Sequence, residues 1–348
     1  MGHKVRFEPV DIEIEVEEDE TILNAAFRQG VTLMHGCKEG QCSACKSFLL
    51  DGDMDMDRYS TFALADYEKE EGYVLLCRAH AYSDLEVELV NYDEDMLRSG
   101  IPIQTAKTEV EEIEELTHDI RRLSLRLVEP KEFAFGSGQY VDLTIPGTDR
   151  TRAFSMANTP NRDDHLEFII KLYPEGRFSK LLDGGLKPGD ELVAKGPYGM
   201  CTLRPDSDRD IVFVGGGAGM APLLSLVRSL AETGSSRKAT FYYGARQAAD
   251  LFYLDELKTL EERIPGFRFV PALSETDEGG EWEGATGLIT DILEHEESDL
   301  HGSDAYLCGP PPMIDAAIPV LTAKGVEEPH LYFDRFTVSS DAEEEAST

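Results

Sequence analysis

Four of the six cysteines in this 348-residue sequence have a spacing that could hold iron. Cys37, Cys42 and Cys45 form the pattern C-x4-C-x2-C, and Cys77 follows after a gap of 31 residues. Thiolates in this order bind two-iron two-sulfur (2Fe-2S) clusters, with two thiolates on each iron. A zinc site or buried structural thiols are the alternatives. Structural zinc sites usually have two close-spaced cysteine pairs, and here only Cys42 and Cys45 form one, which favours the cluster.

A second constellation is rich in glycine. The apolar run Ile211–Val214 leads into a turn that contains Gly215, Gly216, Gly217 and Gly219, and a helix-like stretch follows. Glycines permit a tight turn and close backbone approach, and a helix N-terminus offers unpaired N–H groups to an anion. A glycine run by itself can be an ordinary turn, so its place after a strand carries the prediction of a dinucleotide-binding site.

The remaining two cysteines lie in different surroundings. Cys308, Gly309 and Pro310 follow the strand-like run Ala305–Leu307, at the strand end where open α/β sheets bind ligands. Cys308 is therefore a candidate catalytic residue, and the alternative is that it fills the core as a small hydrophobe. Cys201 has no such context, and we interpret it as structural.

Two shorter motifs lie between strand-like runs in the middle of the chain. The first is Arg152–Ser155, which includes Phe154. The second begins at Lys171 and continues through Gly176 to Ser179. Taken alone, Arg152 would more often be a solvated surface charge, and Gly176 an ordinary turn. Small residues and backbone amides in such a turn can be presented to a phosphate group.

The elements that must position these residues fall into three segments. Alternating apolar residues and a helix-like stretch from Thr21 to Gln29 come first, then runs of period-2 alternation, and then strands that alternate with helices. These patterns predict an α+β domain, an antiparallel barrel and a parallel α/β sheet. The predicted boundaries are 1–98, 101–206 and 207–336, followed by a disordered acidic tail at 337–348.

The charge of the chain restricts its partners. Asp and Glu number 68 against 33 Lys and Arg, a formal net charge of −35, which would repel nucleic acid. The first hundred residues hold 9 basic and 23 acidic side chains, so 9 − 23 gives −14. An acidic domain of this kind could be steered to a basic protein partner, although a surface adapted for solubility explains most of the charges equally well.

No targeting or membrane segment is evident in the sequence. The start, Met1–Arg6, lacks the apolar run of a signal peptide, and the longest apolar run, Ile211–Val227, is interrupted by four glycines and a proline. We therefore expect a cytoplasmic protein that does not associate with membranes. In that reducing compartment, six cysteines are ligands or buried thiols rather than disulfides.

The motifs together resemble the ferredoxin-NADP reductase superfamily, preceded by a plant-type 2Fe-2S ferredoxin domain. The resemblance covers nearly the whole chain and implies a β-grasp ferredoxin domain, an antiparallel FAD barrel and a doubly wound NAD domain. It also implies that Arg152 pairs with the flavin pyrophosphate, that Phe154 stacks on the flavin ring and that Ser155 lies near flavin N5. By the same resemblance Lys171, Gly176 and Ser179 bind the cofactor, Cys308 lies beside the nicotinamide, and Phe336 reaches the flavin face or fills the core.

The preference for NADH over NADPH is less clear from the residues. The simple rule asks for an acidic residue at the end of the second strand, but Thr240–Ala245 offers none, and the next residue, Arg246, could accept a 2′-phosphate. The stretch from Tyr243 to Phe252 nevertheless resembles the NADH-using members. We therefore expect NADH as the reductant.

The domain order resembles the reductases of soluble methane, phenol and propane monooxygenases, and also those of benzoate-type dioxygenases. The stretches 33–42, 57–64 and 154–160 look most like the propane monooxygenase branch. The resemblance implies an NADH-dependent reductase that passes electrons through FAD and a 2Fe-2S cluster to a separate hydroxylase. The alternatives are a reductase for a ring-hydroxylating dioxygenase and a non-catalytic redox sensor.

Overall fold

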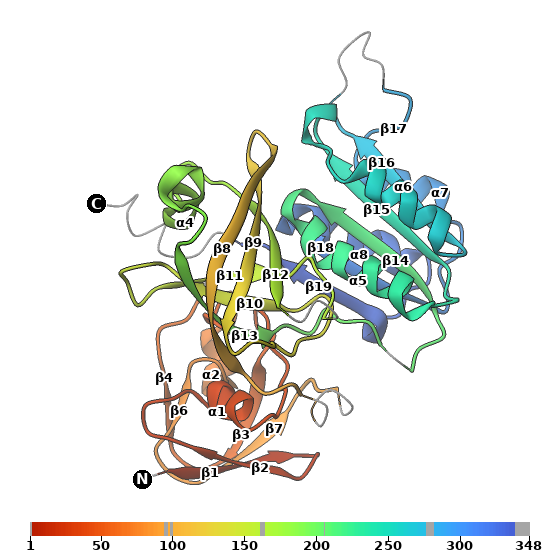
Figure 1. Cartoon of the computed structure of the whole chain (residues 1–348). Coiled ribbons are helices and arrows are strands. Elements are labelled where there is room, and N and C mark those ends of the chain that lie inside the picture. The colour runs from red at the N-terminus through yellow and green to blue at the C-terminus, as the bar shows by residue number, and fades with distance from the viewer. Residues whose placement is uncertain are drawn as a thin grey trace. The chain divides into compact units, whose positions relative to one another are not determined.

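The structure is a computed structural model and describes residues 2–93, 97, 100–160, 164–204, 206–275 and 282–337. The chain folds into two compact units, Met1–Gln104 and Thr105–Thr348. The second unit contains both a barrel and a parallel sheet (Figure 1). Residues 338–348, which make up nearly all of the predicted acidic tail, lie outside the described residues.

The first unit is a mixed sheet with a helix against it, the β-grasp arrangement. Its five strands lie in the order β2-β1-β7-β3-β5, and β1 and β7 are parallel neighbours. The helix begins after Thr21, whose hydroxyl accepts the N–H of Asn24, and ends before Gln29, as the sequence predicts. The elements are β1 His3–Glu8, β2 Ile12–Val16, α1 Ile22–Arg28, β3 Lys46–Asp51, β4 Met54–Met56, α2 Asp66–Glu71, β5 Tyr73–Leu75, β6 Ala79–Ala81 and β7 Leu85–Leu89.

The barrel opens the second unit. Its six strands lie in the order β11-β10-β13-β8-β9-β12, and an isolated bridge between Met156 and Phe168 joins the two ends. Period-2 alternation points Leu123, Leu125 and Leu127 into the core. The elements are β8 Gln104–Thr117, β9 Ile120–Glu129, β10 Tyr140–Thr144, β11 Thr151–Ser155, β12 His165–Lys171, α4 Arg177–Lys180, η1 Leu181–Gly185 and β13 Glu191–Tyr198.

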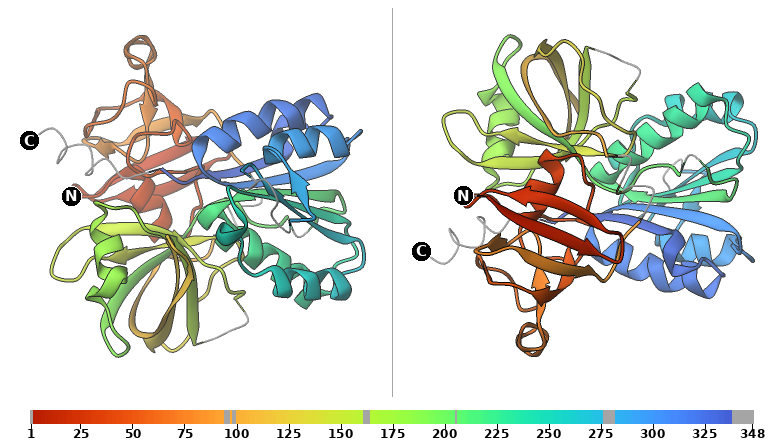
Figure 2. Two further views of the ribbon diagram at one scale, coloured as in Figure 1. Left: turned by 90° about the horizontal axis from the view of Figure 1, so that it is seen from above. Right: turned by 90° about the horizontal axis from the view of Figure 1, so that it is seen from below.

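The rest of the second unit is a parallel sheet with helices on both faces. Figure 2 shows α5 and α6 on one side of the sheet and α7 and α8 on the other. The elements are β14 Asp210–Gly216, η2 Gly217–Gly219, α5 Met220–Thr233, β15 Ala239–Ala245, η3 Ala248–Asp250, α6 Leu254–Arg263, β16 Phe267–Leu273, β17 Ala285–Thr286, α7 Ile289–Glu296, β18 Ser303–Gly309, α8 Pro311–Ala323, η4 Glu328–His330 and β19 Leu331–Arg335.

Burial on both faces explains why these strands are continuously apolar. Ile211 and Phe213 pack with α5 and α6, whereas Val212 and Val214 pack with α7 and α8. The strand order β17-β16-β15-β14-β18-β19 changes direction between β14 and β18. Ligands of such sheets bind beyond the carboxyl ends of the strands at this switch point. Among the described residues, no helix combines the length and apolar character needed to cross a membrane.

A buried arginine joins the sheet to the barrel. Arg228 of α5 donates to the carbonyl oxygen of Ala157 at 2.8 Å and to Glu167 at 2.8 Å, both on the barrel side. Its other nitrogens reach both oxygens of Glu256 at 2.7 and 2.9 Å. The Arg228 side chain is only 18% exposed and that of Glu167 only 9%. The network therefore fixes the sheet against the barrel.

We expect Arg228→Met to lower the free energy of unfolding by about 3 kcal/mol, because it leaves two carboxylates without their cation. The matched control is Arg126→Met, which breaks the half-exposed pair with Glu109 and should cost less than about 1 kcal/mol. Urea denaturation of both variants measures the difference. Equal losses would show that Arg228 does not stabilise this junction.

Candidate functional site

The four cysteines of the first unit lie together as two pairs. Cys37 hydrogen-bonds to Cys42, and Cys45 to Cys77. Backbone N–H groups point at the sulfurs: that of Cys37 lies 3.2 Å from Cys42 Sγ, and that of Gln41 lies 3.2 Å from Cys37 Sγ. Among the described residues, no three His, Cys, Asp or Glu side chains are grouped as ligands of one metal ion. Two pairs of thiols match two irons, each with two protein ligands.

The environment of the sulfurs also fits a cluster. Each pair shares one proton unequally. The hydrogen bond between Cys37 and Cys42 lowers the pKa of the Cys37 thiol to about 6, with burial opposing it and the Gln41 and Glu39 amides adding to it, and it raises the pKa of Cys42. The bond between Cys45 and Cys77 likewise lowers the pKa of Cys45 and raises that of Cys77. A Cβ atom on Gly36 would lie 2.9 Å from Cys42 Sγ, so only glycine leaves room beside that sulfur. Thiolates with backbone donors are what iron requires.

The predicted flavin residues lie along one edge of the barrel. Arg152, Phe154 and Ser155 are on β11, and Ser155 is buried at the end of the strand. The Phe154 ring packs on Phe178 of α4, with 4.6 Å between the ring centroids. One aromatic ring is therefore held where β11 meets the turn that carries the second motif.

That turn is narrow at Gly176. A Cβ there would lie 2.6 Å from Ser179 Oγ, which itself accepts the N–H of Tyr173 at 2.9 Å. The small residues thus leave backbone accessible, as a pyrophosphate needs. The structure pairs Lys171 with Asp119 at 3.0 Å, which shows an ionic partner for Lys171 that the sequence did not indicate.

The glycine turn joins β14 to α5 as predicted. Gly217 has a positive φ of 56°, and a Cβ on Gly215 would lie 2.7 Å from Leu223. A Cβ on Gly219 would lie 2.0 Å from the carbonyl oxygen of Cys308, so the turn is pressed against β18. A Cβ on Gly309 would lie 2.9 Å from the carbonyl oxygen of Gly216, so the two motifs also approach closely there. Space remains beside Gly217, where an added Cβ would meet nothing within 4 Å.

The second motif of the sheet lies directly beside this turn. Cys308 is the penultimate residue of β18, Gly309 ends the strand with a φ of 142°, and Pro310 is the N-cap residue of α8. Phe336 donates its N–H to the Gly309 carbonyl at 2.9 Å, which brings the predicted aromatic residue to the same edge. The structure therefore gathers the predicted nicotinamide residues at the switch point.

Cys201 connects the two halves of this unit. Its thiol lies 3.6 Å from that of Cys308, and both are buried. Cys201 lies three residues after the end of β13, so the barrel contacts the sheet at the predicted nicotinamide site. The sequence interpretation of Cys201 as structural missed this contact, because a buried cysteine carries no sign of its partner.

A carboxyl group that sequence reasoning left without a role lies beside Cys308. Asp334 of β19 is the register partner of Cys308, and its backbone N–H hydrogen-bonds to the Cys308 sulfur. Although part of the residue reaches the surface, burial of the carboxyl raises its pKa from 3.8 to about 7. The only sequence feature that could have pointed to Asp334 as a site residue is its position two residues before Phe336. A carboxyl with such a pKa can hold or release a proton near neutral pH.

The raised pKa of Asp334 predicts a pH dependence of stability. The folded chain keeps a proton that the unfolded chain loses, so the stabilisation is present below pH 3.8 and is lost as the pH rises to about 7. We expect Asp334→Asn to flatten the decline in melting temperature across this window. Thermal melts at a series of pH values test it, and parallel curves for both proteins would contradict it.

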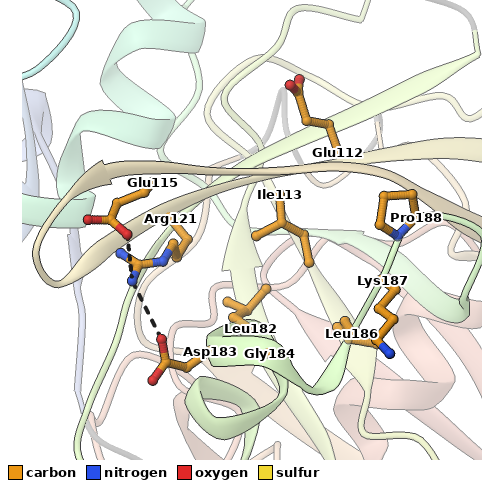
Figure 3. A pocket seen from close by; sticks show the side chains of 10 residues that line it. All are labelled: Glu112, Ile113, Glu115, Arg121, Leu182, Asp183, Gly184, Leu186, Lys187 and Pro188. Carbon is orange, nitrogen blue, oxygen red and sulfur yellow. Dashed lines mark ion pairs between the residues drawn. The ribbon is translucent and has the colours of Figure 1, made fainter.

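A separate hollow on the barrel has a volume of about 410 Å³ and contains none of the predicted cofactor residues. Figure 3 shows Arg121 between Glu115 and Asp183, with ion-pair distances of 3.3 and 3.5 Å. Three acidic side chains line it, which does not suit a phosphate. We assign it no part in the site.

Family models match each part of the chain. They are a 2Fe-2S iron-sulfur cluster binding domain at residues 5–82, an oxidoreductase FAD-binding domain at 107–202 and an oxidoreductase NAD-binding domain at 213–318. The fold and the site therefore define an NADH-dependent flavin iron–sulfur oxidoreductase.

Relatives of known name extend over almost the whole chain. The reductase component of propane 2-monooxygenase from Mycolicibacterium goodii is 55% identical over 97% of this chain and 97% of the relative. The reductase component DmpP of phenol 2-monooxygenase from Pseudomonas sp. (strain CF600) is 39% identical over 100% and 98%. The crystal structure of the Amycolatopsis cytochrome P450 reductase GcoB is 32% identical, with a TM-score of 0.88 over 97% and 100%. The chain belongs to the family of reductase components of multicomponent monooxygenases.

Proposed function

We propose that this chain reduces the hydroxylase component of a propane-type multicomponent monooxygenase with electrons from NADH. The observation that carries the proposal is the 55% identity, over 97% of both chains, to a propane 2-monooxygenase reductase component. The acidic first unit, at −14 over a hundred residues, supports docking on a basic protein surface. We further propose a cytoplasmic location, where NADH is available.

The site residues take the following proposed roles. When bound, FAD supplies the conversion of a two-electron hydride into the single electrons that an iron–sulfur cluster carries. Cys37, Cys42, Cys45 and Cys77 hold the cluster. Arg152, Gly176 and Ser179 hold the flavin phosphates, Phe154 supports the ring, and Lys171 adds positive charge near them, steadied by Asp119.

The sheet residues orient the nicotinamide. The turn at Gly215, Gly216, Gly217 and Gly219 binds the dinucleotide phosphates, and Gly309 and Pro310 shape the neighbouring edge. Cys308 and Ser155 confine the reacting groups from the two sides of the site, and Phe336, directly after β19, covers it. Enclosure of this kind keeps water away during hydride transfer.

The proposed domains are 1–98 for the cluster, 101–206 for FAD and 207–336 for NAD. Their division has a physical purpose, because the nicotinamide site must be enclosed whereas the cluster must reach another protein. The tail 337–348 has no proposed role in catalysis.

A reconstitution experiment tests the partner. The purified reductase is mixed with NADH and either a di-iron propane hydroxylase or a Rieske-type dioxygenase, and product formation is measured. We expect hydroxylation only with the di-iron protein. Turnover of the dioxygenase instead would move the chain to the ring-hydroxylating systems, and slow reduction of every acceptor would favour a sensor.

A further inference from the structure

Selection between NADH and NADPH depends on what meets the 2′ position of the adenosine ribose. NADPH has a phosphate there, and NADH has a hydroxyl. An acidic residue at the end of the second strand selects NADH, and an arginine accommodates the phosphate. Here the second strand, β15, ends at Ala245 and is followed by Arg246. If the residues at the end of β15 alone decided the choice, the chain should accept NADPH.

The sheet order places the adenosine ribose near Arg246. The phosphate-binding turn follows β14, and Cys308 on β18 contacts Cys201 of the barrel that carries the flavin motifs. The nicotinamide must reach that barrel, so it lies on the β18 side. The adenosine end then extends the opposite way, over the carboxyl ends of β15 and β16, which lie side by side in Figure 1. This placement rests on the function proposed above.

An acidic residue reaches this point from the third strand. Beyond the last register pair of β15 and β16, Ser274 donates its N–H to the Ala245 carbonyl at 3.0 Å, and Glu275 donates to the Arg246 carbonyl at 2.8 Å. These backbone bonds keep Arg246 and Glu275 next to each other. The backbone of the sheet therefore holds Arg246 and Glu275 side by side, whatever conformation their side chains adopt.

The two side chains form an ion pair with two contacts. Glu275 Oε1 lies 3.0 Å from Arg246 Nη2 and 3.1 Å from its Nε, and Gln247 Nε2 reaches the other carboxylate oxygen at 3.5 Å. The side chains are 77% exposed for Arg246 and 49% exposed for Glu275. A pair this exposed adds little to stability but remains within reach of a ligand.

We propose that Glu275 makes the chain selective for NADH. Its carboxylate pairs with the Arg246 guanidinium, which would otherwise bind a 2′-phosphate. The negative charge of the carboxylate also repels that phosphate directly. A neutral ribose hydroxyl suffers neither effect and can donate a hydrogen bond to the carboxylate. The acidic residue that selects NADH, usually found at the end of the second strand, here follows the neighbouring strand β16.

Among the residues that the structure describes, Asp250 is a second acidic residue near this edge. One of its oxygens accepts the N–H of Gln247 at 3.0 Å, and the other lies 3.4 Å from His118 Nδ1 of the barrel. Its carboxylate is directed to the turn it caps and to the barrel. Arg246 has its ion pair with Glu275 instead.

The test compares kcat/KM for NADH and NADPH with ferricyanide as the acceptor, using the full-length holoenzyme. Glu275→Gln keeps the shape of the side chain and removes its charge. We expect kcat/KM for NADPH to rise about 10- to 100-fold. That for NADH should fall by no more than about threefold, because the amide oxygen still accepts the ribose hydroxyl but without the charge of the carboxylate. Adding Arg246→Ala to this variant should remove most of the gain, because the freed guanidinium is its source.

The matched control is Glu296→Gln, which removes the same charge from the Arg268 ion pair at the amino end of β16. It should leave the preference unchanged. An unchanged NADPH efficiency in Glu275→Gln, a gain that survives Arg246→Ala, or a gain seen only in Asp250→Asn would each overturn the inference. Wild-type protein that oxidised neither nucleotide would instead contradict the proposed function.

Discussion

Replacing Cys42 with serine is expected to abolish NADH-dependent reduction of cytochrome c and to leave reduction of ferricyanide largely intact. Cys42 is paired with Cys37, and its sulfur accepts the backbone N–H of Cys37 at 3.2 Å, so it is one of the four predicted cluster ligands. A hydroxyl is a poor substitute for the soft thiolate that iron–sulfur clusters need. The predicted flavin and nicotinamide residues lie in the other compact unit and keep their structure.

Iron content and visible absorbance establish the loss of the cluster, and the two acceptor assays follow the electrons. Cys201→Ser is the matched control, since it removes a buried thiol of the other compact unit, paired there with Cys308, and should leave the iron content unchanged. Equal loss of both activities in Cys42→Ser would contradict the proposed order, in which NADH reduces the flavin first and the flavin can pass electrons to ferricyanide without the cluster.

The second large effect is expected from Gly219→Ala. Its new methyl group would lie 2.0 Å from the carbonyl oxygen of Cys308 and 2.5 Å from the carbonyl carbon. Both are backbone atoms of a central strand, so the glycine turn must move away from β18. A displacement of about 1 Å in positioned reactants can cost about 100-fold in rate, and we expect flavin reduction by NADH to slow at least that much.

Anaerobic rapid mixing with NADH measures this rate as the loss of flavin absorbance. Reduction by dithionite, which needs no nicotinamide site, should proceed normally. Gly136→Ala is the control, because its methyl group would meet no atom nearer than 3.4 Å. A folded Gly219→Ala variant with the wild-type rate would show that the turn is not part of the hydride-transfer site.

Local features could be predicted because neighbouring residues determine them. The C-x4-C-x2-C spacing fixes which sulfurs can share one loop, and Thr21 caps α1 whatever lies around it. Alternating apolar residues indicate that a barrel strand buries one face, and continuous apolar runs indicate that a parallel strand buries both faces. The fold class followed from these patterns, and the structural relatives and sheet order confirm it.

Contacts between residues distant in the chain were decided only by the tertiary structure. Nothing in the sequence around Cys201 points to Cys308, 107 residues away, and nothing near Arg246 points to Glu275 on the next strand. The pKa of Asp334 depends on burial at the edge of β18, which a single segment does not reveal. Side-chain chemistry is carried by the residue, whereas its partners and its desolvation depend on how separate strands are brought together.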